Sequence, residues 1–364
     1  MSIESKLELV QKTHDQQKNS PAHKRLELLF DEGSFVEIDS LAKSGDGYAE
    51  VVAGFGAVEG YPVYAFAQNS DVAGGAMSKA HAAKIKKVYG MAVKTGAPVV
   101  GIYDSVGARL KEGNEMLNAY GEILLDANNL SGVVPQISVI AGPCIGTAAL
   151  LAASADIVIM SEAAQLDLET NGAAGSSEEA AKTGMAHILA ADDKAAVLEA
   201  KKLLSMLPSN NLTSAPVSEY SDAAGCEAAF QAVAAAIENG SKEAVASRLV
   251  EAAADAGSGV EFSAAYGKGM VCALAAVGGS VCGMVACNKA ENEGKIDADA
   301  CAKAARFVRF CDAFAIPVIT FVDAVGFESL KEASKLSHAY AEATTAKISV
   351  ITGAAYGAAF IAMA

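Results

Sequence analysis

Two long stretches of the chain repeat each other, and this internal repeat constrains the fold more than any other feature of the sequence. Residues 58–107 align with residues 277–326 without a gap, with glycine, lysine, proline and aspartate recurring at matching positions. After a small change of spacing, residues 137–152 match residues 348–363. A repeat of this length exceeds the roughly 20 to 50 residues of a solenoid unit. The sequence therefore predicts two similar domains, which can face each other across a cleft.

Length, charge and cysteine content narrow the classes of function. The 364 residues exceed the roughly 250 to 300 at which a single hydrophobic core stops growing, as two domains require. A net charge of −15 argues against a nucleic-acid partner, because phosphate backbones need clustered cations, whereas a small anionic ligand needs only a few. The seven cysteines form no CxxC pair and leave an odd one, so we expect neither a zinc site nor disulfides, and a cytoplasmic location.

Neither a signal peptide nor a membrane span is expected. The first residues lack a basic segment followed by an apolar core. Residues 137–160 are long and apolar enough to imitate a span, but Gly142, Pro143, Gly146 and Asp156 interrupt them. Strand, turn and buried helix explain this stretch better.

Short apolar runs alternate with helical patterns in both halves. Residues 51–68 suggest a hairpin, residues 79–95 a helix, and residues 99–103 a buried strand. A second helix is expected over residues 117–130 and a second strand over residues 137–140. This alternation is typical of βα units around largely parallel sheets. Each half is therefore predicted to be an α/β domain.

A stretch rich in proline, serine and asparagine follows Leu207, where the first repeat has ended. An alanine-rich segment with helical spacing comes next and ends before a Gly-Ser-Gly break. We therefore expect an N-terminal domain over residues 1–207, a linker with a helical lead-in over residues 208–258, and a C-terminal domain over residues 259–364.

The two repeats agree on a strand, a glycine-containing turn and a helix of small residues. The turns are AGPCIGTA at residues 141–148 and TGAAYGAA at residues 352–359. Main-chain N–H groups at the start of a helix lack acceptors, and small side chains let a ligand oxygen approach them. This arrangement can form an oxyanion hole. For either turn alone, close packing of helix on sheet is the better explanation, whereas two equivalent turns favour a functional interpretation.

Other patterns give weaker chemical signals. The chain has no GxSxG elbow and no P-loop, and its histidines show no metal-ligand spacing. Lys79, Lys84, Lys86, Lys87 and Arg109 could receive phosphates, although a solvated helix face is the simpler explanation for most of these lysines. The sequence thus provides anion-stabilising turns without an evident nucleophile or acid–base pair.

Several long motifs, in order along nearly the whole chain, resemble the carboxyltransferase subunit of biotin-dependent acyl-CoA carboxylases, of the propionyl-CoA carboxylase β type, and of the related acyl-CoA decarboxylases. The matching stretches are DEGSFVEID (31–39), TGAPVVGIYDSVGARLKEG (95–113), AYGEIL with SGVVPQISVIAGPCIG (119–146), LLSMLPSNN (203–211), ARFVRFCDAFAIPVITFVDAVGF (305–327) and YAEATTAKISVITGAAYGAAF (340–360). The resemblance implies two tandem crotonase-like (ClpP/crotonase) α/β domains related by the repeat, with acyl-CoA on the N-terminal domain and carboxybiotin on the C-terminal domain of a second subunit.

The resemblance also implies a mechanism in which biotin, carried on another protein, supplies the base and the protein stabilises two oxyanions. The first oxyanion hole maps onto the amides of Gly146 and Thr147, for the thioester enolate, and the second onto Ala358 and Ala359, for the ureido oxygen. The residues implied in binding acyl-CoA or biotin are Gly107, Ala108, Arg109, Gly142, Tyr356 and Gly357. Expected partners are a biotin carboxyl carrier protein and biotin carboxylase or decarboxylase subunits, in a homo-oligomer that is a dimer or a trimer of dimers.

The chain also departs from the family pattern. The paired glycines of the family become Gly146-Thr147 and Gly357-Ala358, and the segments at residues 160–183 and 328–332 are shorter. The C-terminal domain is expected to be incomplete at Ala364. Two alternatives to carboxylation of a short acyl-CoA therefore stay open: transfer in the decarboxylase direction from a malonyl-type CoA, and a non-catalytic assembly subunit.

Overall fold

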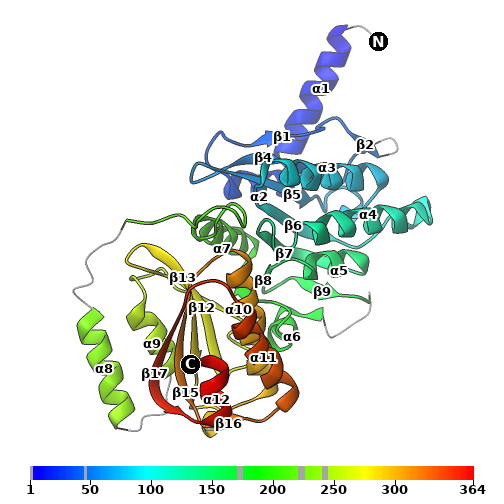
Figure 1. The fold of residues 1–364 in the computed structure, drawn as a ribbon. Helices are drawn as coiled ribbons and strands as arrows, with labels where there is room; N and C mark the ends of the chain where they lie inside the picture. Colours follow the sequence, from blue (N-terminus) through cyan, green and yellow to red (C-terminus); the bar gives the residue numbers. More distant parts are fainter. Residues whose placement is uncertain (1–2, 45–46, 170–174, 220–225, 240–244) are drawn as a thin grey trace. The chain divides into compact units, whose positions relative to one another are not determined.

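A computed structural model describes residues 3–44, 47–169, 175–219, 226–239 and 245–364 (Figure 1). The chain divides into two compact units. Unit 1 comprises Met1–Ala180 with Leu189–Ser205, and unit 2 comprises Ala181–Ile188 with Met206–Ala364. The domain limits at residues 207 and 258 stay predictions.

Unit 1 is built on one mixed sheet. Its strand order is β1-β4-β5-β6-β7-β8-β10, and β9 pairs with the end of β7. The strands are β1 (Val36–Glu37), β4 (Val51–Val58), β5 (Tyr61–Gln68), β6 (Val99–Ser105), β7 (Gln136–Ile145), β8 (Ile157–Ser161), β9 (Gln165–Asp167) and β10 (Ile188–Ala190), beside a separate pair of β2 (Lys43–Ser44) with β3 (Gly47–Tyr48). The β4–β5 hairpin is antiparallel and β5 to β8 run parallel, as the sequence predicts.

The helices of unit 1 follow the predicted pattern. They are α1 (Ile3–Lys18), α2 (Pro21–Leu29), α3 (Lys79–Thr95), α4 (Glu115–Asn129), α5 (Thr147–Ala153), α6 (Ser177–Lys182) and α7 (Asp193–Met206). The α3 helix begins where the Ser78 hydroxyl accepts a hydrogen bond from the His81 amide, and it ends at Gly96 in the left-handed conformation. The predicted helix at residues 79–95 is thereby confirmed.

Unit 2 repeats this arrangement with fewer strands. Its sheet has the order β11-β12-β13-β15-β17. The strands are β11 (Val260–Phe262), β12 (Met270–Val277), β13 (Ser280–Cys287), β15 (Val318–Ala324) and β17 (Lys347–Ala355), beside a short pair of β14 (Lys295–Ile296) with β16 (Gly326–Phe327), and the helices are α8 (Cys226–Glu238), α9 (Val245–Ala253), α10 (Ala298–Ala313), α11 (Leu330–Glu342) and α12 (Gly357–Met363). The α8 and α9 helices lie in the predicted linker. Residues 220–225 and 240–244 of this linker lie outside the described residues, and so do residues 170–174 of the shortened segment at 160–183.

The two sheets share an irregularity at the same place. The pairing of β6 with β7 shifts between Tyr103 and Ser105, and the pairing of β15 with β17 shifts between Val322 and Ala324. These positions are equivalent in the repeat. Both shifts lie at the carboxyl ends of parallel strands, where open α/β sheets place their ligands.

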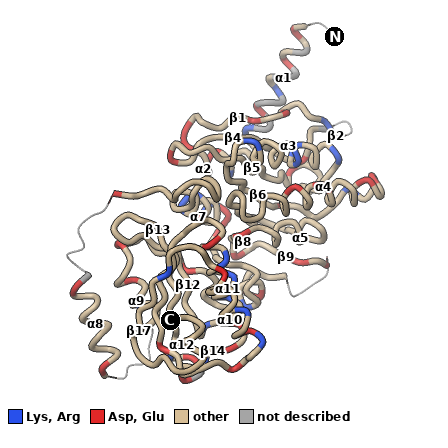
Figure 2. Tube along the Cα trace, in the orientation of Figure 1, with Lys and Arg blue, Asp and Glu red and all other residues tan. Residues whose placement is uncertain are grey.

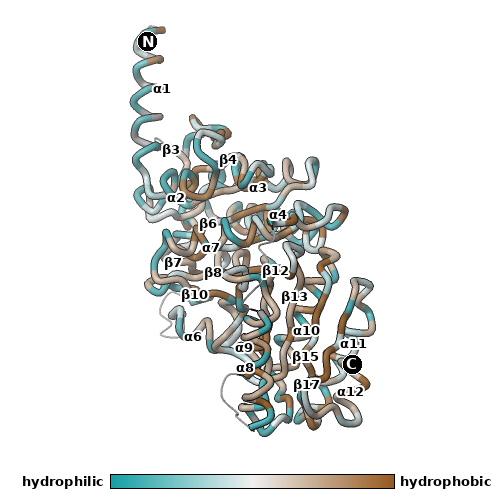
Figure 3. The backbone as a smooth tube through the Cα atoms, turned by 90° about the vertical axis from the view of Figure 1, so that its left-hand side faces the viewer, coloured by the Kyte–Doolittle hydropathy of each residue, from teal (hydrophilic) through white to brown (hydrophobic). Residues whose placement is uncertain are grey.

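Charged residues lie mainly on helices and loops, and the central strands carry few of them (Figure 2). Hydrophobic residues gather in the strands, whereas α1 is largely hydrophilic (Figure 3). Every residue of β6 is buried, as its apolar run predicts. Within the described parts of the chain, the helices are too short or too polar to cross a lipid bilayer.

Candidate active site

The first predicted turn lies where β7 meets α5. Gly146 has φ 69° and ψ −134°, a conformation that residues with a side chain rarely adopt. Its amide donates to the Asp167 carbonyl at 2.8 Å. The amides of Thr147 and Ala148 come before the first helical acceptor, and no carbonyl of the described residues accepts from them. A Cβ at Gly146 would meet no atom within 4 Å, so the space in front of this turn is open.

The second turn lies where β17 meets α12. Tyr356 precedes the helix in extended conformation, and Gly357 has φ 49°. The Ala359 amide donates to the Tyr356 carbonyl at 3.0 Å, and the Ala359 side chain is fully buried. The amides of Gly357 and Ala358 have no acceptor among the described residues. The space in front of Gly357 is open as well.

One amide is available at the same place in both turns. Thr147 and Ala358 are equivalent in the repeat, are both exposed, and offer amides without an acceptor in the described chain. Gly146 and Ala359, which complete the two predicted pairs, donate within the protein instead. The reason at Gly146 is that β7 runs on through Gly142 and Pro143 to Ile145, because its end pairs with β9. The sequence had placed the end of this strand at Ile140.

A carboxylate faces a glycine beside each turn. A Cβ on Gly142 would lie 2.3 Å from Oδ1 of Asp104, and a Cβ on Gly353 would lie 2.4 Å from Oδ1 of Asp323. These aspartates are the second-to-last residues of β6 and β15 and are equivalent in the repeat. The two glycines are therefore required by close approach, since any side chain would collide with the carboxylate.

The two carboxylates are held by different cations. Asp104 is buried, and its Oδ2 receives Arg25 Nη1 and the Ser70 hydroxyl, both at 2.8 Å. Asp323 Oδ1 receives Lys289 Nζ at 3.1 Å and the Ala354 amide at 2.7 Å. The repeat aligned the two aspartates, but nothing in the sequence indicated these partners.

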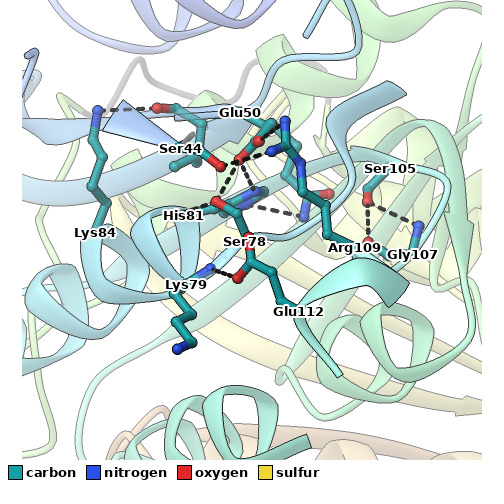
Figure 4. Close-up of polar contacts among 12 residues, drawn as sticks. Ser44, Glu50, Ser78, Lys79, His81, Lys84, Ser105, Gly107, Arg109 and Glu112 are labelled. Atoms are coloured by element: carbon teal, nitrogen blue, oxygen red, sulfur yellow. Dashed lines mark hydrogen bonds and ion pairs between the residues drawn. The ribbon is translucent and has the colours of Figure 1, made fainter. Parts of the chain in front are cut away.

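The loop after β6 holds the predicted binding residues Gly107, Ala108 and Arg109, and Figure 4 shows Gly107 and Arg109. Gly107 has φ 112°, and a Cβ there would lie 3.5 Å from the Ile145 carbonyl, next to the first turn. Ala108 forms a parallel bridge with Met77. The guanidinium of Arg109 pairs with the buried carboxylate of Glu50.

The other cations that could receive phosphates also have carboxylate partners. Lys84 is buried and lies 3.2 Å from Glu37, while the exposed Lys79, Lys86 and Lys87 pair with Glu115, Glu122 and Asp39. Three of these four lysines therefore lie on a solvated helix face, as the simpler explanation predicts.

Neither His81 nor Cys144 titrates near neutrality. Burial, with a smaller contribution from the charges of Lys84 and Arg109, lowers the pKa of His81 to about 3. Burial raises the pKa of the Cys144 thiol far above its ordinary value. No three His, Cys, Asp or Glu residues of the described chain converge as metal ligands. The chemistry that these turns support is stabilisation of negative charge by main-chain amides.

Comparison with known proteins shows the family to which the chain belongs. The family model "Carboxyl transferase domain" matches residues 13–364. The chain is 38% identical to the propionyl-CoA carboxylase beta chain of Saccharopolyspora erythraea, covering 97% of this chain and 72% of that one. It is 35% identical to methylmalonyl-CoA decarboxylase subunit alpha of Veillonella parvula, covering 97% and 76%.

The solved structure of transcarboxylase 12S, a hexamer with hydrolysed methylmalonyl-coenzyme A bound, matches with a TM-score of 0.87 at 34% identity, over 97% of this chain and 75% of that one. This match confirms the predicted crotonase-like α/β fold with an internal repeat.

Proposed function

The chain belongs to the carboxyl transferase family of biotin-dependent carboxylases, and we propose that it moves a carboxyl group between carboxybiotin on a carrier protein and a short-chain acyl-CoA. One observation carries the proposal: the same turn occurs twice, and each copy exposes an amide that no described residue accepts from, at Thr147 and at Ala358. Transfer of this kind develops negative charge on two oxygens, and such amides stabilise that charge.

The first turn would hold the acyl-CoA. In this proposal the Thr147 amide donates to the thioester oxygen, on which charge develops as the α-proton leaves and the enolate forms. The open space in front of Gly146 admits that oxygen. Gly142 and Asp104 would keep the end of β7 in place, and the loop at Gly107 and Ala108 would line the adjoining surface.

The second turn would hold biotin. The open space in front of Gly357 and the available Ala358 amide suit a ureido oxygen, with the exposed Tyr356 side chain next in the chain. Bound biotin would supply the carboxyl group and the base that removes the α-proton. A cofactor base is consistent with the buried, neutral state of His81 and with the high pKa of the Cys144 thiol.

Transfer in the opposite direction, from a malonyl-type CoA to biotin, is the second candidate. It is favoured by the similarity to methylmalonyl-CoA decarboxylase subunit alpha over 97% of this chain. The same two turns serve both directions, because the enolate is common to them. Incubation with free biotin and either methylmalonyl-CoA or malonyl-CoA, followed by detection of the decarboxylated thioester, tests for transfer from CoA. The absence of any transfer would refute catalysis and favour an assembly subunit.

The role of the Thr147 amide can be tested without a change of fold. Thr147 is the first residue of α5, where proline is well tolerated, and the extended ψ of Gly146 is compatible with a following proline. Thr147→Pro removes the N–H and is expected to lower turnover about 10²- to 10³-fold. Thr147→Ala keeps the N–H and serves as the control, with turnover close to that of the wild type. Equal turnover in the two variants would place the oxyanion donor elsewhere.

We further propose that the protein works as a homo-oligomer, a dimer or trimer of dimers, with a biotin carboxyl carrier protein and a biotin carboxylase or decarboxylase subunit. The support is that both turns occur in one chain, so that a two-fold assembly could form two mixed sites, and that the similar transcarboxylase 12S forms a hexamer. Light scattering at micromolar concentration tests this. A mass of 37.0 kDa, that of one chain, would contradict it.

A further inference from the structure

Glu50 is a fully buried carboxylate directly before β4. Its Oε1 pairs with Arg109 Nη2, and its Oε2 accepts from the Ser78 hydroxyl at 2.7 Å (Figure 4). The Nδ1 atom of His81 lies 4.0 Å from Oε2, but burial keeps this imidazole neutral. In the described chain, Arg109 is therefore the residue whose charge compensates Glu50. Burial of an ionised carboxylate without such a partner is very unfavourable.

The guanidinium of Arg109 makes two contacts in this part of the protein. Besides the pair with Glu50, its Nη1 donates to the Ser44 hydroxyl at 2.9 Å. The side chain is 28% exposed. A cation held in this way differs from a free phosphate ligand, because binding a phosphate would require it to leave a buried carboxylate unpaired.

The two groups held by Glu50 belong to two segments that pair with each other. Ser78 follows Met77, and Arg109 follows Ala108. The Met77 amide donates to the Gly107 carbonyl at 2.8 Å, and the Arg109 amide donates to the Met77 carbonyl at 2.9 Å. The Glu50 carboxylate thus contacts both paired segments, one through Ser78 and the other through Arg109.

The bridged loop lies against the first turn. The Gly107 amide donates to the Ser105 hydroxyl at 3.1 Å, which tightens the loop, and Ser105 pairs in register with Cys144 on β7. Gly107 itself approaches the carbonyl of Ile145, the residue before Gly146. Displacement of this loop would therefore change the surface beside the Thr147 amide.

We propose that Glu50 is a positioning residue of the acyl-CoA site, which acts by fixing the loop of residues 105–109 through Arg109 and Ser78 without touching the substrate. Arg109 has the same role and is not a ligand of the CoA phosphates. This inference rests on the proposed function and adds residues that the turns alone do not reveal. A positioning role also gives a reason for this ion pair, because a buried ion pair by itself is weak evidence of added stability.

The experiment compares two thioesters that differ in phosphate. Propionyl-CoA and propionyl-pantetheine, which lacks the nucleotide and every phosphate, are titrated by calorimetry into the full chain and into Glu50→Gln, Arg109→Met and the double variant. Each single variant is expected to weaken binding of both thioesters by the same factor, about 10- to 100-fold. The double variant is expected to be no weaker than the poorer single variant, because both act through one contact. Lys86→Met, which removes an exposed cation of α3, is the control and is expected to bind both thioesters normally.

Three results would overturn the inference. Arg109→Met could weaken propionyl-CoA alone, which would make Arg109 a phosphate ligand. Glu50→Gln could bind both thioesters as the wild type does. Where these variants fail to fold, Ser44→Ala removes one acceptor of Arg109 without leaving a buried charge unpaired. It is expected to weaken the binding of both thioesters about two- to ten-fold. Unchanged binding in Ser44→Ala would be the third result that overturns the inference. Failure of the wild type to bind either thioester would refute the proposed function itself.

Discussion

The contact between Gly142 and Asp104 predicts a large effect from a single methyl group. In Gly142→Ala the new Cβ would lie 2.3 Å from Oδ1 of Asp104, whereas ordinary contact begins near 3.4 Å. The carboxylate cannot retreat by this roughly 1 Å without stretching its bonds to Arg25 and Ser70, both at 2.8 Å. Overpacking in a core costs about 1–3 kcal/mol, and hydrogen bonds to a charged group contribute about 1.5–3 kcal/mol each. We therefore expect a loss of about 2–4 kcal/mol in the free energy of unfolding.

The same substitution at Gly121 is the matched control. Gly121 lies inside α4, and a Cβ there would meet no atom within 4 Å. Alanine is favoured over glycine in a helix by about 1 kcal/mol, so Gly121→Ala should raise stability. Urea unfolding followed by circular dichroism measures both variants. Stability of Gly142→Ala within about 0.5 kcal/mol of the wild type would refute the assigned contact, since surface changes alone are of that size.

Three further predictions concern residues of unit 1. Arg25→Met leaves Asp104 buried without its cation and should lower the free energy of unfolding in urea by about 3–5 kcal/mol. Lys87→Met, which breaks an exposed pair with Asp39, should cause no measurable change in stability. Similar losses in both variants would contradict the burial argument. Gly146→Val forces a branched residue to φ 69°, so we expect a stability loss of about 1–3 kcal/mol. We also expect carboxyl transfer to fall about 10²- to 10³-fold. Normal transfer in the folded variant would be inconsistent with an oxyanion hole at the first turn. His81 has a pKa of about 3 in the folded protein and 6.5 as a free side chain, so the unfolded state binds more protons between these pH values. The free energy of unfolding therefore falls as the pH drops from 6.5 toward 3. His81→Gln should reduce this slope by up to about 1.4 kcal/mol per pH unit, and an unchanged slope would mean that His81 is not buried as described.

Local patterns in the sequence were sufficient for much of the fold. The hairpin at residues 51–68 and the helix at residues 79–95 were predicted because alternation, turn residues and caps act over a few positions. The position of both turns followed from the repeat. The full length of β7 was not predictable, because Pro143 pairs with Gln165 on β9, and proline ordinarily argues against a strand.

The details of the site depended on contacts between residues far apart in the chain. Gly146 was predicted to offer its amide, but the acceptor that occupies it is the Asp167 carbonyl, which no local pattern indicates. Arg109 was predicted as a binding residue from its motif, and its partner Glu50 precedes it by a whole hairpin and helix. Sequence shows which residues carry charge or lack a side chain, whereas their partners follow from the packing of the sheet.

Because the cations beside the two equivalent aspartates differ in exposure, we expect the two units to respond differently to ionic strength. The Arg25 side chain is only 10% exposed, so dissolved ions cannot screen its pair with Asp104. Lys289 is 47% exposed, and its single ammonium contact with Asp323 competes with water and counterions. Added salt should therefore loosen the end of β15 while leaving the end of β6 unaffected. Of the two turns in this repeated fold, the one beside Asp104 would then keep its conformation as the ionic strength changes. The one beside Asp323 would become more mobile.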